Sequence, residues 1–178
     1  MEFKSEIMDS DALRRCLIRI SHQILERNGG TENLCLVGIK TRGVPLAEMI
    51  RDNIAAIEGT KVPTGTIDIS FYRDDIAHAF PDPKIGGADL PFDIEGKTIV
   101  LVDDVIYTGR TTRAAIECLL KHGRPDYVQL AVVIDRGHRE LPIRPDFVGK
   151  NIPTSCDELI SVRLPSVDGE FGVKLFAK

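Results

Sequence analysis

Residues 98–113, TIVLVDDVIYTGRTTR, decide the fold of this chain. The unbroken aliphatic run at 99–102 is typical of a central strand that is buried on both faces of a parallel sheet. Asp103 and Asp104 follow directly, so we expect two carboxylates at the carboxyl end of this strand, where open α/β sheets bind their ligands. The stretch therefore predicts an α/β fold with its chemistry at that edge of the sheet.

A loop rich in hydroxyl groups, YTGRTT at 107–112, comes next and leads into a helical pattern at 114–120. Unpaired N–H groups at a helix start favour a phosphate, whereas Asp103 and Asp104 suit vicinal hydroxyls, so together they describe a ribose 5-phosphate site. The chain has no GxxxxGK string, which excludes a Walker loop, and the acids precede the glycine, which excludes the dinucleotide fingerprint. Taken alone, aspartates at a strand end and a capping Thr111 or Thr112 are also ordinary structural features.

The elements on either side extend the α/β pattern. Strands are predicted at 34–39, 66–71, 127–134, 158–163 and 170–176, and helices from residue 10 to about 27 and from Pro45 to about residue 58. We expect one domain over residues 1–178, with a central, mainly parallel sheet flanked by helices.

Composition restricts the class of protein. No apolar run approaches the ~20 residues of a membrane span, and the first ten residues lack the apolar core of a signal peptide, so we expect a cytoplasmic protein with no membrane partner. Its four cysteines lie far apart without CxxC spacing, which argues against a zinc site or a disulfide framework. The net charge of −4 argues against an obligate nucleic-acid binder but leaves room for a local basic face.

A second anion site is predicted where strand 34–39 ends. Lys40 and Arg42 could neutralise a diphosphate there, with Thr41 and the backbone N–H groups around Gly43 as further donors. Two anion-binding turns in one α/β domain favour a substrate that carries phosphates at both ends.

Two later segments also carry charge at the ligand edge. The stretch from about 72 to 96 is rich in Pro, Gly and Asp, which predicts a disordered segment or a functional lid, and Arg73 at its base is the candidate cation that closes over the diphosphate. Arg136 follows strand 127–134 and could meet the nucleotide or the diphosphate. Residues 141–155 are predicted to be irregular and to form part of a hood above the sheet, from about 137 to 178.

The stretch 98–113, with its hydrophobic strand, two acids, loop and T-G-x-T, resembles the phosphoribosyl-pyrophosphate signature of the type I phosphoribosyltransferases. Within that family the chain is similar, from about residue 14 to 164, to the group of bifunctional pyrimidine-operon attenuators and uracil phosphoribosyltransferases. The strings that carry this likeness are ALRRCLIRISHQILERN from residue 12, LVGIKTRG at 36–43, IDISFYRDD at 67–75, and QLAVVIDRGHRELPIRPDFVGKNIPTS at 129–155. The resemblance implies the type I fold, with a small hood at about 137–178 and a flexible arm at about 72–96.

The implied reaction is uracil plus phosphoribosyl pyrophosphate giving UMP and diphosphate, with Mg²⁺ bound mainly through the substrate and no metal site made by the protein alone. Asp103, Asp104 and Arg73 are then the catalytic candidates. The implied substrate contacts are Lys40, Thr41, Arg42, Gly43, Val105, Ile106, Tyr107, Thr108, Gly109, Arg110, Thr111, Arg136 and, through its backbone toward the uracil edge, Val162.

The second activity implied is binding of pyrimidine-operon leader mRNA, promoted by UMP and UTP, in a homodimer or homotetramer. The basic side of the first helix and the segment after residue 135 would make the RNA face, through Arg15, Arg19, His22, Arg27, His138, Arg139, Arg144 and Lys150. The chain departs from the group's pattern at Ile18, where RNA-binding members carry threonine, and at Cys156, where a basic residue would help.

Three alternatives stay open at this point. The first is a salvage enzyme without RNA binding, whose basic helix face is only solvated. The second is a hypoxanthine or guanine transferase, because those enzymes share the signature. The third is a regulator that binds phosphoribosyl pyrophosphate without turnover, against which the intact pair Asp103 and Asp104 and the nearby cations argue.

Overall fold

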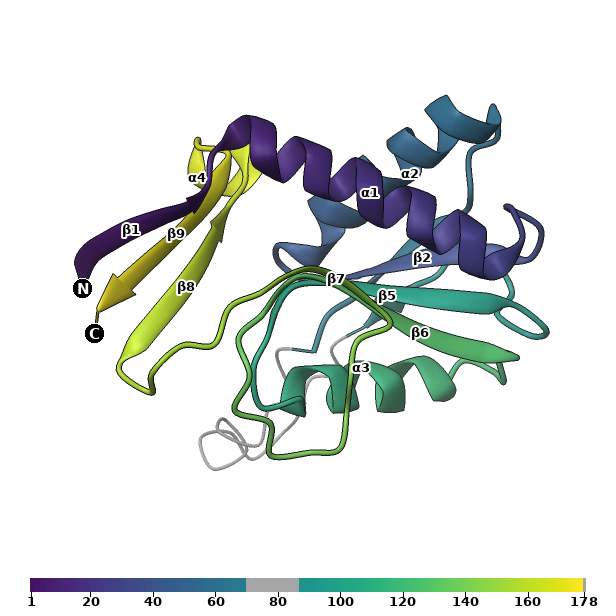
Figure 1. The fold of residues 1–178 in the computed structure, drawn as a ribbon. Coiled ribbons are helices and arrows are strands. Elements are labelled where there is room, and N and C mark those ends of the chain that lie inside the picture. The colour runs from purple at the N-terminus through teal and green to yellow at the C-terminus, as the bar shows by residue number, and fades with distance from the viewer. Residues whose placement is uncertain (70–86, 178) are drawn as a thin grey trace.

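A computed structural model of the protein describes residues 1–69 and 87–177 (Figure 1). Its centre is a six-stranded sheet in the order β4-β3-β2-β5-β6-β7, parallel throughout except for β4 at one edge. The strands are β2 (Leu34–Ile39), β3 (Thr64–Ile67), β4 (Ala88–Asp89), β5 (Thr98–Ile106), β6 (Tyr127–Asp135) and β7 (Phe147–Asn151). Every residue of β2 is buried, as the continuous aliphatic run predicts for a strand that is covered on both faces.

Three helices cover the two faces of this sheet. Figure 1 shows α1 (Ser10–Asn28) and α2 (Gly43–Glu58) on one face and α3 (Arg110–Leu120) on the other. Helix α1 begins at Asp9, whose side chain accepts a hydrogen bond from the N–H of Ala12 at 2.7 Å, and it ends at Gly29 with φ of 66°. The predicted limits of α1 and the predicted central, mainly parallel sheet flanked by helices are thus confirmed.

Alternate residues of the buried strands build two separate cores. Leu36 and Val100 point toward α1 and α2, whereas Val37 and Leu101 point toward α3. Because both sides of the central strands are apolar and covered, polar chemistry is left to the strand ends. No helix in the described part of the chain has the length and apolar character needed to cross a membrane.

A second, three-stranded antiparallel sheet lies beside the first and is called the hood below. Its order is β1-β9-β8, formed by β1 (Glu2–Met8), β9 (Gly172–Ala177) and β8 (Glu158–Arg163), and the short helix α4 (Pro165–Asp168) connects β8 to β9. The first and last strands of the described chain are paired over five register positions, from Glu2 with Ala177 to Met8 with Val173 (Figure 1).

The structure corrects several predicted boundaries. Residues 147–151 were predicted to be irregular and part of the hood, but they form β7, which pairs with β6 through Val132 and Val148. Strand β5 continues four residues beyond Val102, so both aspartates lie within its last part. The strand predicted at 66–71 begins at Thr64 and ends at Ile67, and the one predicted at 170–176 is β9.

The predicted arm at 72–96 is only partly described. Its end, Ala88–Asp89, pairs with β3 as β4, so this part belongs to the central sheet. Arg73 lies outside the described residues. Strand β1 was not predicted at all.

Candidate active site

A cavity of about 320 Å³ opens at the carboxyl ends of β2 and β5. It brings together the turn after β2 and the acidic end of β5, as the parallel arrangement of these strands requires. Its lining residues are Lys40, Thr41, Arg42, Ile69, Asp103, Asp104, Val105 and Thr111. All of these except Ile69 were predicted as site residues.

The two aspartates at the end of β5 are oriented by their own backbone. Oδ1 of Asp103 accepts from the N–H of Asp104 at 2.9 Å, and Oδ1 of Asp104 accepts from the N–H of Val105 at 2.8 Å. Burial raises the pKa of Asp103 well above the usual range, and the charge of Asp104 raises it further. Burial also raises the pKa of Asp104, although the Asp103 hydrogen bond and the nearby Arg42 oppose the rise. The cavity therefore holds two carboxylates at some electrostatic cost.

The turn 40–43 faces these carboxylates across the cavity. The N–H of Lys40 donates to the carbonyl of Ile67 at 2.8 Å, and its ammonium group lies 3.7 Å from a carboxylate oxygen of Asp68. The Lys40–Thr41 peptide bond is cis. Gly43 begins α2 against β5, so closely that a Cβ atom there would lie 2.2 Å from the carbonyl oxygen of Val102. Gly43 thus allows the close approach of turn and strand that forms the cavity.

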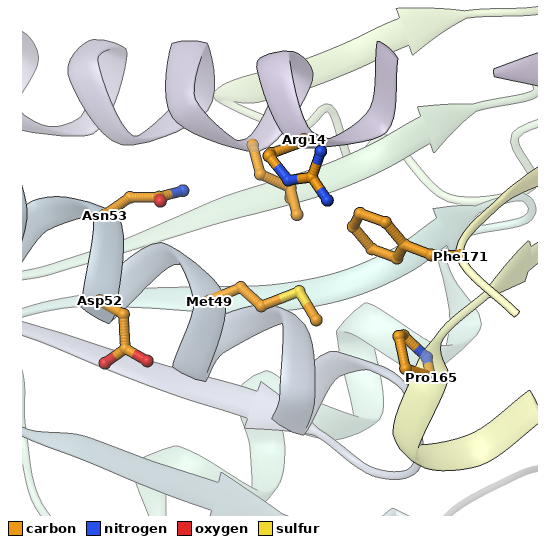
Figure 2. Close-up of a pocket in the computed structure, with 7 residues that line it drawn as sticks. Arg14, Met49, Asp52, Asn53, Pro165 and Phe171 are labelled. Atoms are coloured by element: carbon orange, nitrogen blue, oxygen red, sulfur yellow. The ribbon is translucent and has the colours of Figure 1, made fainter. Parts of the chain in front are cut away.

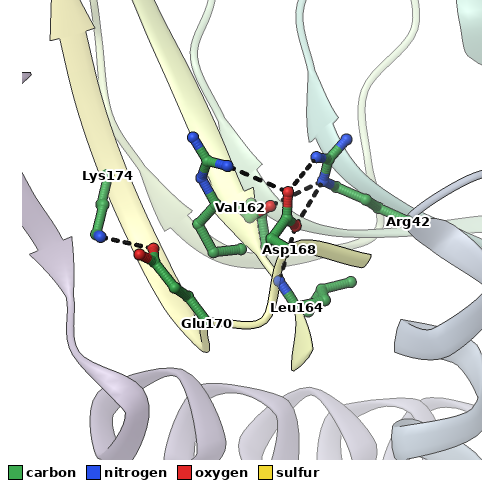
Figure 3. A network of polar contacts seen from close by, with 7 residues as sticks. Arg42, Val162, Leu164, Asp168, Glu170 and Lys174 are labelled. Carbon is green, nitrogen blue, oxygen red and sulfur yellow. Dashed lines mark hydrogen bonds and ion pairs between the residues drawn. The ribbon is translucent and has the colours of Figure 1, made fainter. Parts of the chain in front are cut away.

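Arg42 connects this turn to the hood (Figure 3). Its Nε donates to the carbonyl of Val162 at 2.9 Å and to Asp168 at 3.3 Å, and its Nη2 donates to Asp168 at 2.7 Å. Its Nη1 donates to none of the described residues. The predicted cation at the diphosphate turn is therefore held on its outer side by a carboxylate from α4.

The hydroxyl-rich loop forms a tight start to α3. Gly109 precedes the helix with φ of 92°, and the N–H of Arg110 donates to Oγ1 of Thr108 at 3.3 Å. The carbonyl of Thr108 is held by the N–H groups of Glu140 and Leu141, at 3.0 and 3.2 Å. Thr111 in the first turn lines the cavity. This arrangement places the helix N-terminus beside the aspartates, as the phosphate prediction requires.

Two of the predicted substrate contacts have partners within the protein. Arg136 is only 5% exposed, and it donates to Oγ1 of Thr154 at 2.9 Å and to the carbonyl of Ser155 at 3.1 Å. Its guanidinium group also lies 4.2 Å from the ring centroid of Tyr107. Neither Arg136 nor Tyr107 lines the cavity. Arg136 thus connects the end of β6 to Tyr107 in the loop before α3 and to the segment 154–155, and its contact with the substrate stays a prediction.

The remaining predicted contacts divide between the core and the surroundings of the cavity. Ile106 is buried in the core on the α3 side, and Val162 is buried in β8 with its carbonyl already accepting from Arg42. Arg110 is exposed and pairs with Glu140 at 2.7 Å. The predicted residues outside the cavity lining are Gly43, Ile106, Tyr107, Thr108, Gly109, Arg110, Arg136 and Val162.

The basic residues of α1 that were predicted to bind RNA lie next to β7. Arg15, Arg19 and Lys150 line a shallow groove of about 360 Å³. Arg19 donates to the carbonyls of Val148 and Gly149, so it fastens the helix to the edge strand, whereas Arg15 and Lys150 are exposed and have no partner among the described residues.

Further along α1, Arg27 pairs with Asp146 at 3.2 Å and His22 is exposed. Arg144, which follows Ile143 in the loop before β7, is also exposed. The edge strand β7 and the exposed side of α1 thus form one surface, on which Arg19 and Arg27 already have partners within the protein. Ile18 lies within this surface and is 38% exposed.

His138 and Arg139 are placed differently from the α1 residues. The side chain of Arg139 donates to Asp135, to the carbonyl of Tyr107 at 2.8 Å and to the carbonyl of Ile143 at 2.9 Å. The ring of His138 hydrogen-bonds to the carbonyl of Thr154. Ile143, in the same loop, packs against the core on the α3 side, so this loop runs on the face opposite α1. The predicted RNA residues therefore lie on both faces of the sheet, and Arg139 has a structural role.

A second cavity, of about 340 Å³, lies between α1, α2 and the hood (Figure 2). Leu17, Met49, Pro165 and Phe171 give it an apolar interior, and Arg14, Asp52 and Asn53 contribute polar groups. It holds no pair of side chains suited to acid, base or nucleophilic chemistry.

Two residues near the active cavity were missed as site residues. Ile69 was predicted only as one face of a strand, and its position shows that the chain after β3 forms a wall of the cavity. Asp168 belongs to no motif, and its link to Arg42 joins residues 126 positions apart in the chain. The alternation around Ile69 could have placed it at the strand end, but no local signal could have identified Asp168.

Comparison with known proteins places this geometry in a family context. The family model described as phosphoribosyl transferase domain matches residues 4–162. A bifunctional protein PyrR from Clostridioides difficile is 57% identical over 172 residues, which cover 97% of each chain. A bifunctional protein PyrR from Thermus aquaticus is 55% identical over 178 residues, which cover 100% of this chain and 98% of that one.

Solved structures with the same fold are more distant in sequence. A hypoxanthine-guanine phosphoribosyltransferase from Bacillus anthracis superposes with a TM-score of 0.73 at 17% identity and covers 98% of each chain. A hypoxanthine phosphoribosyltransferase from Staphylococcus aureus gives a TM-score of 0.72 at 18% identity, over 99% of this chain and 94% of that one. At these identities the likeness shows the fold alone, and it confirms the predicted type I architecture.

Proposed function

The chain belongs to the phosphoribosyltransferase family and, within it, to the group of the bifunctional PyrR proteins, and we propose that it transfers the phosphoribosyl group of phosphoribosyl pyrophosphate to uracil. The products are UMP and diphosphate. The observation that carries this proposal is the single cavity in which Asp103 and Asp104 face the cationic turn 40–43 and Thr111 of α3. A ribose that carries phosphate groups at both ends fits a cavity that combines two carboxylates with a cationic turn and a helix N-terminus.

Each part of the cavity has a distinct task in the displacement at the anomeric carbon. Asp103 and Asp104 accept hydrogen bonds from the two ribose hydroxyls, and their negative charge stabilises the positive charge that develops on the ribose. Thr111 and the N–H groups at the start of α3 hold the 5-phosphate. Lys40, Thr41 and Arg42, together with Arg73, receive the leaving diphosphate as its negative charge grows.

The cavity residues suit Mg²⁺ as the accompanying ion. Carboxylate oxygens are the ligands that this ion prefers, and a divalent cation near Asp103 would offset the repulsion from Asp104 that raises its pKa. When bound with the substrate, Mg²⁺ supplies positive charge to the diphosphate and to the ribose hydroxyls.

Base recognition is assigned to the hood. Uracil offers two carbonyls and an N–H along one edge, and backbone groups of β8 near Val162 can complement them. The hood is brought to the cavity by Arg42, which donates to the carbonyl of Val162 itself.

The regulatory activity is assigned to the exposed side of α1 and the segment around β7. Arg15, His22, Arg144 and Lys150 are exposed there, and they can pair with RNA phosphates or stack on unpaired loop bases. We propose that uridine nucleotides, UMP or UTP, bind the active cavity and promote binding of pyrimidine-operon leader mRNA to this face, in a homodimer or homotetramer in the cytoplasm.

The transferase is tested with a panel of bases. Purified protein with Mg²⁺ and phosphoribosyl pyrophosphate is given uracil, hypoxanthine, guanine or orotate in turn, and diphosphate release is followed, with Asp104→Asn as control. Release with uracil alone, lost in the variant, supports the proposal. Diphosphate release with a purine would make that base the substrate in place of uracil. No release with any of the four bases would favour a regulator that binds phosphoribosyl pyrophosphate without turnover.

RNA regulation needs a separate experiment. Electrophoretic mobility of the operon's leader RNA is measured with and without UMP, at two salt concentrations because phosphate contacts weaken with salt. Binding that UMP strengthens supports the regulatory proposal. No binding at low salt, from a protein that makes UMP, would mean a salvage enzyme only.

A further inference from the structure

Asp168 is a carboxylate with several hydrogen-bond donors around its buried side chain, and it does not line the cavity. Its side chain is 6% exposed and accepts four hydrogen bonds. Oδ1 accepts from Nη2 of Arg42 at 2.7 Å and from Nη1 of Arg163 at 3.2 Å. Oδ2 accepts from Nε of Arg42 at 3.3 Å and from the N–H of Leu164 at 3.0 Å. Figure 3 shows the carboxylate of Asp168 between Arg42 and the N–H of Leu164.

The bond to Arg42 is the strongest of these influences on Asp168. It lowers the pKa of Asp168, so the carboxylate is ionised at neutral pH. Because two donors of one guanidinium group bond to one carboxylate, both the orientation of the guanidinium group and its distance from the carboxylate are fixed. Asp168 therefore determines where the guanidinium group of Arg42 lies.

The remaining part of Arg42 is available to the cavity. Nε and Nη2 are directed at the hood, Nη1 has no acceptor among the described residues, and the side chain lines the cavity beside Asp104. Because Arg42 lines the cavity with Asp104 and bonds to Asp168 on its other side, its guanidinium group lies between the acidic pair and the hood, and its charge opposes the rise in the pKa of Asp104 that burial causes.

We propose that Asp168 is a positioning residue, which holds Arg42 from the hood side so that its free Nη1 edge is presented to the diphosphate of phosphoribosyl pyrophosphate. The inference rests on the proposed function, because it assigns the diphosphate to the turn 40–43. It also explains why a cation of the cavity is bonded to β8: the same guanidinium group links the diphosphate site to the strand that carries Val162.

Asparagine cannot replace Asp168 in this role. All four of its hydrogen bonds are accepted, two at each oxygen, so either orientation of an amide would turn its NH₂ group toward two donors. Glu170 provides a matched control. It lies two residues further on, is exposed, and pairs only with Lys174 among the described residues, at 2.6 Å (Figure 3).

The test measures binding of phosphoribosyl pyrophosphate with Mg²⁺ by isothermal titration calorimetry, without uracil, for the wild type, Asp168→Asn, Glu170→Gln, Arg42→Ala and the double variant Arg42→Ala with Asp168→Asn. Mg²⁺-diphosphate serves as a second probe. We expect Asp168→Asn to weaken both ligands about tenfold, the scale of one lost hydrogen bond to a charged group, and Glu170→Gln to leave them unchanged. In the Arg42→Ala background, Asp168→Asn should then change affinity less than about twofold, because coupled residues are not additive.

Steady-state kinetics add a second readout. A positioning role raises the KM for phosphoribosyl pyrophosphate more than it lowers kcat. A carboxylate that merely stabilised the hood would lower the melting temperature and weaken binding equally with and without Arg42, which would overturn the inference, as would unchanged affinity in Asp168→Asn.

The outcomes separate this inference from the proposed function. A wild-type protein that binds the two probes but transfers to no base refutes the transferase, while the affinity ratios still decide the role of Asp168. A wild-type protein that binds neither probe refutes both.

Discussion

Replacing Gly43 by alanine tests the closest approach in the molecule's active site. A Cβ atom at this position would lie 2.2 Å from the carbonyl oxygen of Val102 and 3.2 Å from its carbonyl carbon, whereas ordinary contact begins at 3.4 Å. Both atoms are backbone atoms of a central strand, so neither can rotate away. The start of α2, and with it the turn 40–43, must move away from β5 by about 1 Å, on the scale of misplacement that can cost roughly 10²-fold in catalysis.

The size of the effect follows from this overlap. Overpacking a core typically costs about 1–3 kcal/mol, and a clash between backbone atoms belongs near the upper end. For a chain of this length, about 3 kcal/mol corresponds to a melting temperature lower by roughly 6–12 °C. We expect UMP formation to fall about a hundredfold in the protein that remains folded, because Lys40 and Arg42 no longer face Asp103 and Asp104 correctly.

Thermal melting by circular dichroism and diphosphate release at 25 °C measure the two effects. Gly87→Ala is the matched control, because it makes the same substitution at a glycine where a Cβ atom would meet nothing within 4 Å and which has no left-handed backbone. Wild-type activity and melting in Gly43→Ala would refute the reasoning, and so would equal damage in Gly87→Ala.

Further predictions concern charge. Burial raises the pKa of Asp103, so folding costs free energy whenever that carboxyl is ionised, and the cost is absent below about pH 3.8, where it is protonated in both states. Asp103→Asn should therefore abolish UMP formation yet raise the melting temperature at pH 7, with a gain that vanishes on acidification; a lower melting temperature at pH 7 would contradict this. Arg136→Lys loses the paired bonds to Thr154 and Ser155 and the stacking on Tyr107, so calorimetry should show a loss of about 2 kcal/mol in stability and weaker binding of phosphoribosyl pyrophosphate; unchanged stability would argue against its supporting role. Arg15→Ala should weaken RNA binding and lower the slope of log affinity against log salt by about 1, without changing the melting temperature. Arg19→Ala should weaken RNA binding and also lower the melting temperature, because the protein loses the bonds from Arg19 to β7. Equal melting temperatures of the two variants would refute that distinction.

Elements with local causes could be predicted from the sequence. The aliphatic run before Asp103 needed only its composition to be recognised as a buried strand, and Asp9 and Gly29 mark the ends of α1 by side-chain and backbone geometry. The cavity followed from the same reasoning, because the residues after β2 and at the end of β5 had to meet at one edge of a parallel sheet.

Elements that depend on distant pairing could not be predicted in this way. Strand β7 has the sequence FVGKN, whose Gly, Lys and Asn disfavour a strand, and it forms because β6 offers it an unpaired edge. Strand β1 is mostly exposed and depends on β9, at the other end of the chain. The roles of Arg136, Arg139 and Asp168 depend likewise on partners whose positions only the folded chain determines.

The pairing of β1 with β9 has a consequence for the order in which the protein assembles. During synthesis β1 is made before the other elements of the described chain, but its partner is made more than 160 residues later, so the three-stranded sheet contains the contacts with the longest sequence separation. The six-stranded sheet and its two cores can form while β1 is still unpaired. Asp168 and Val162 reach Arg42 only from within the hood, so a nascent chain holds an acidic pair and a cationic turn before it has the part that aligns them. Formation of the hood is thus the step that brings Asp168 and Val162 to a cavity that has already formed.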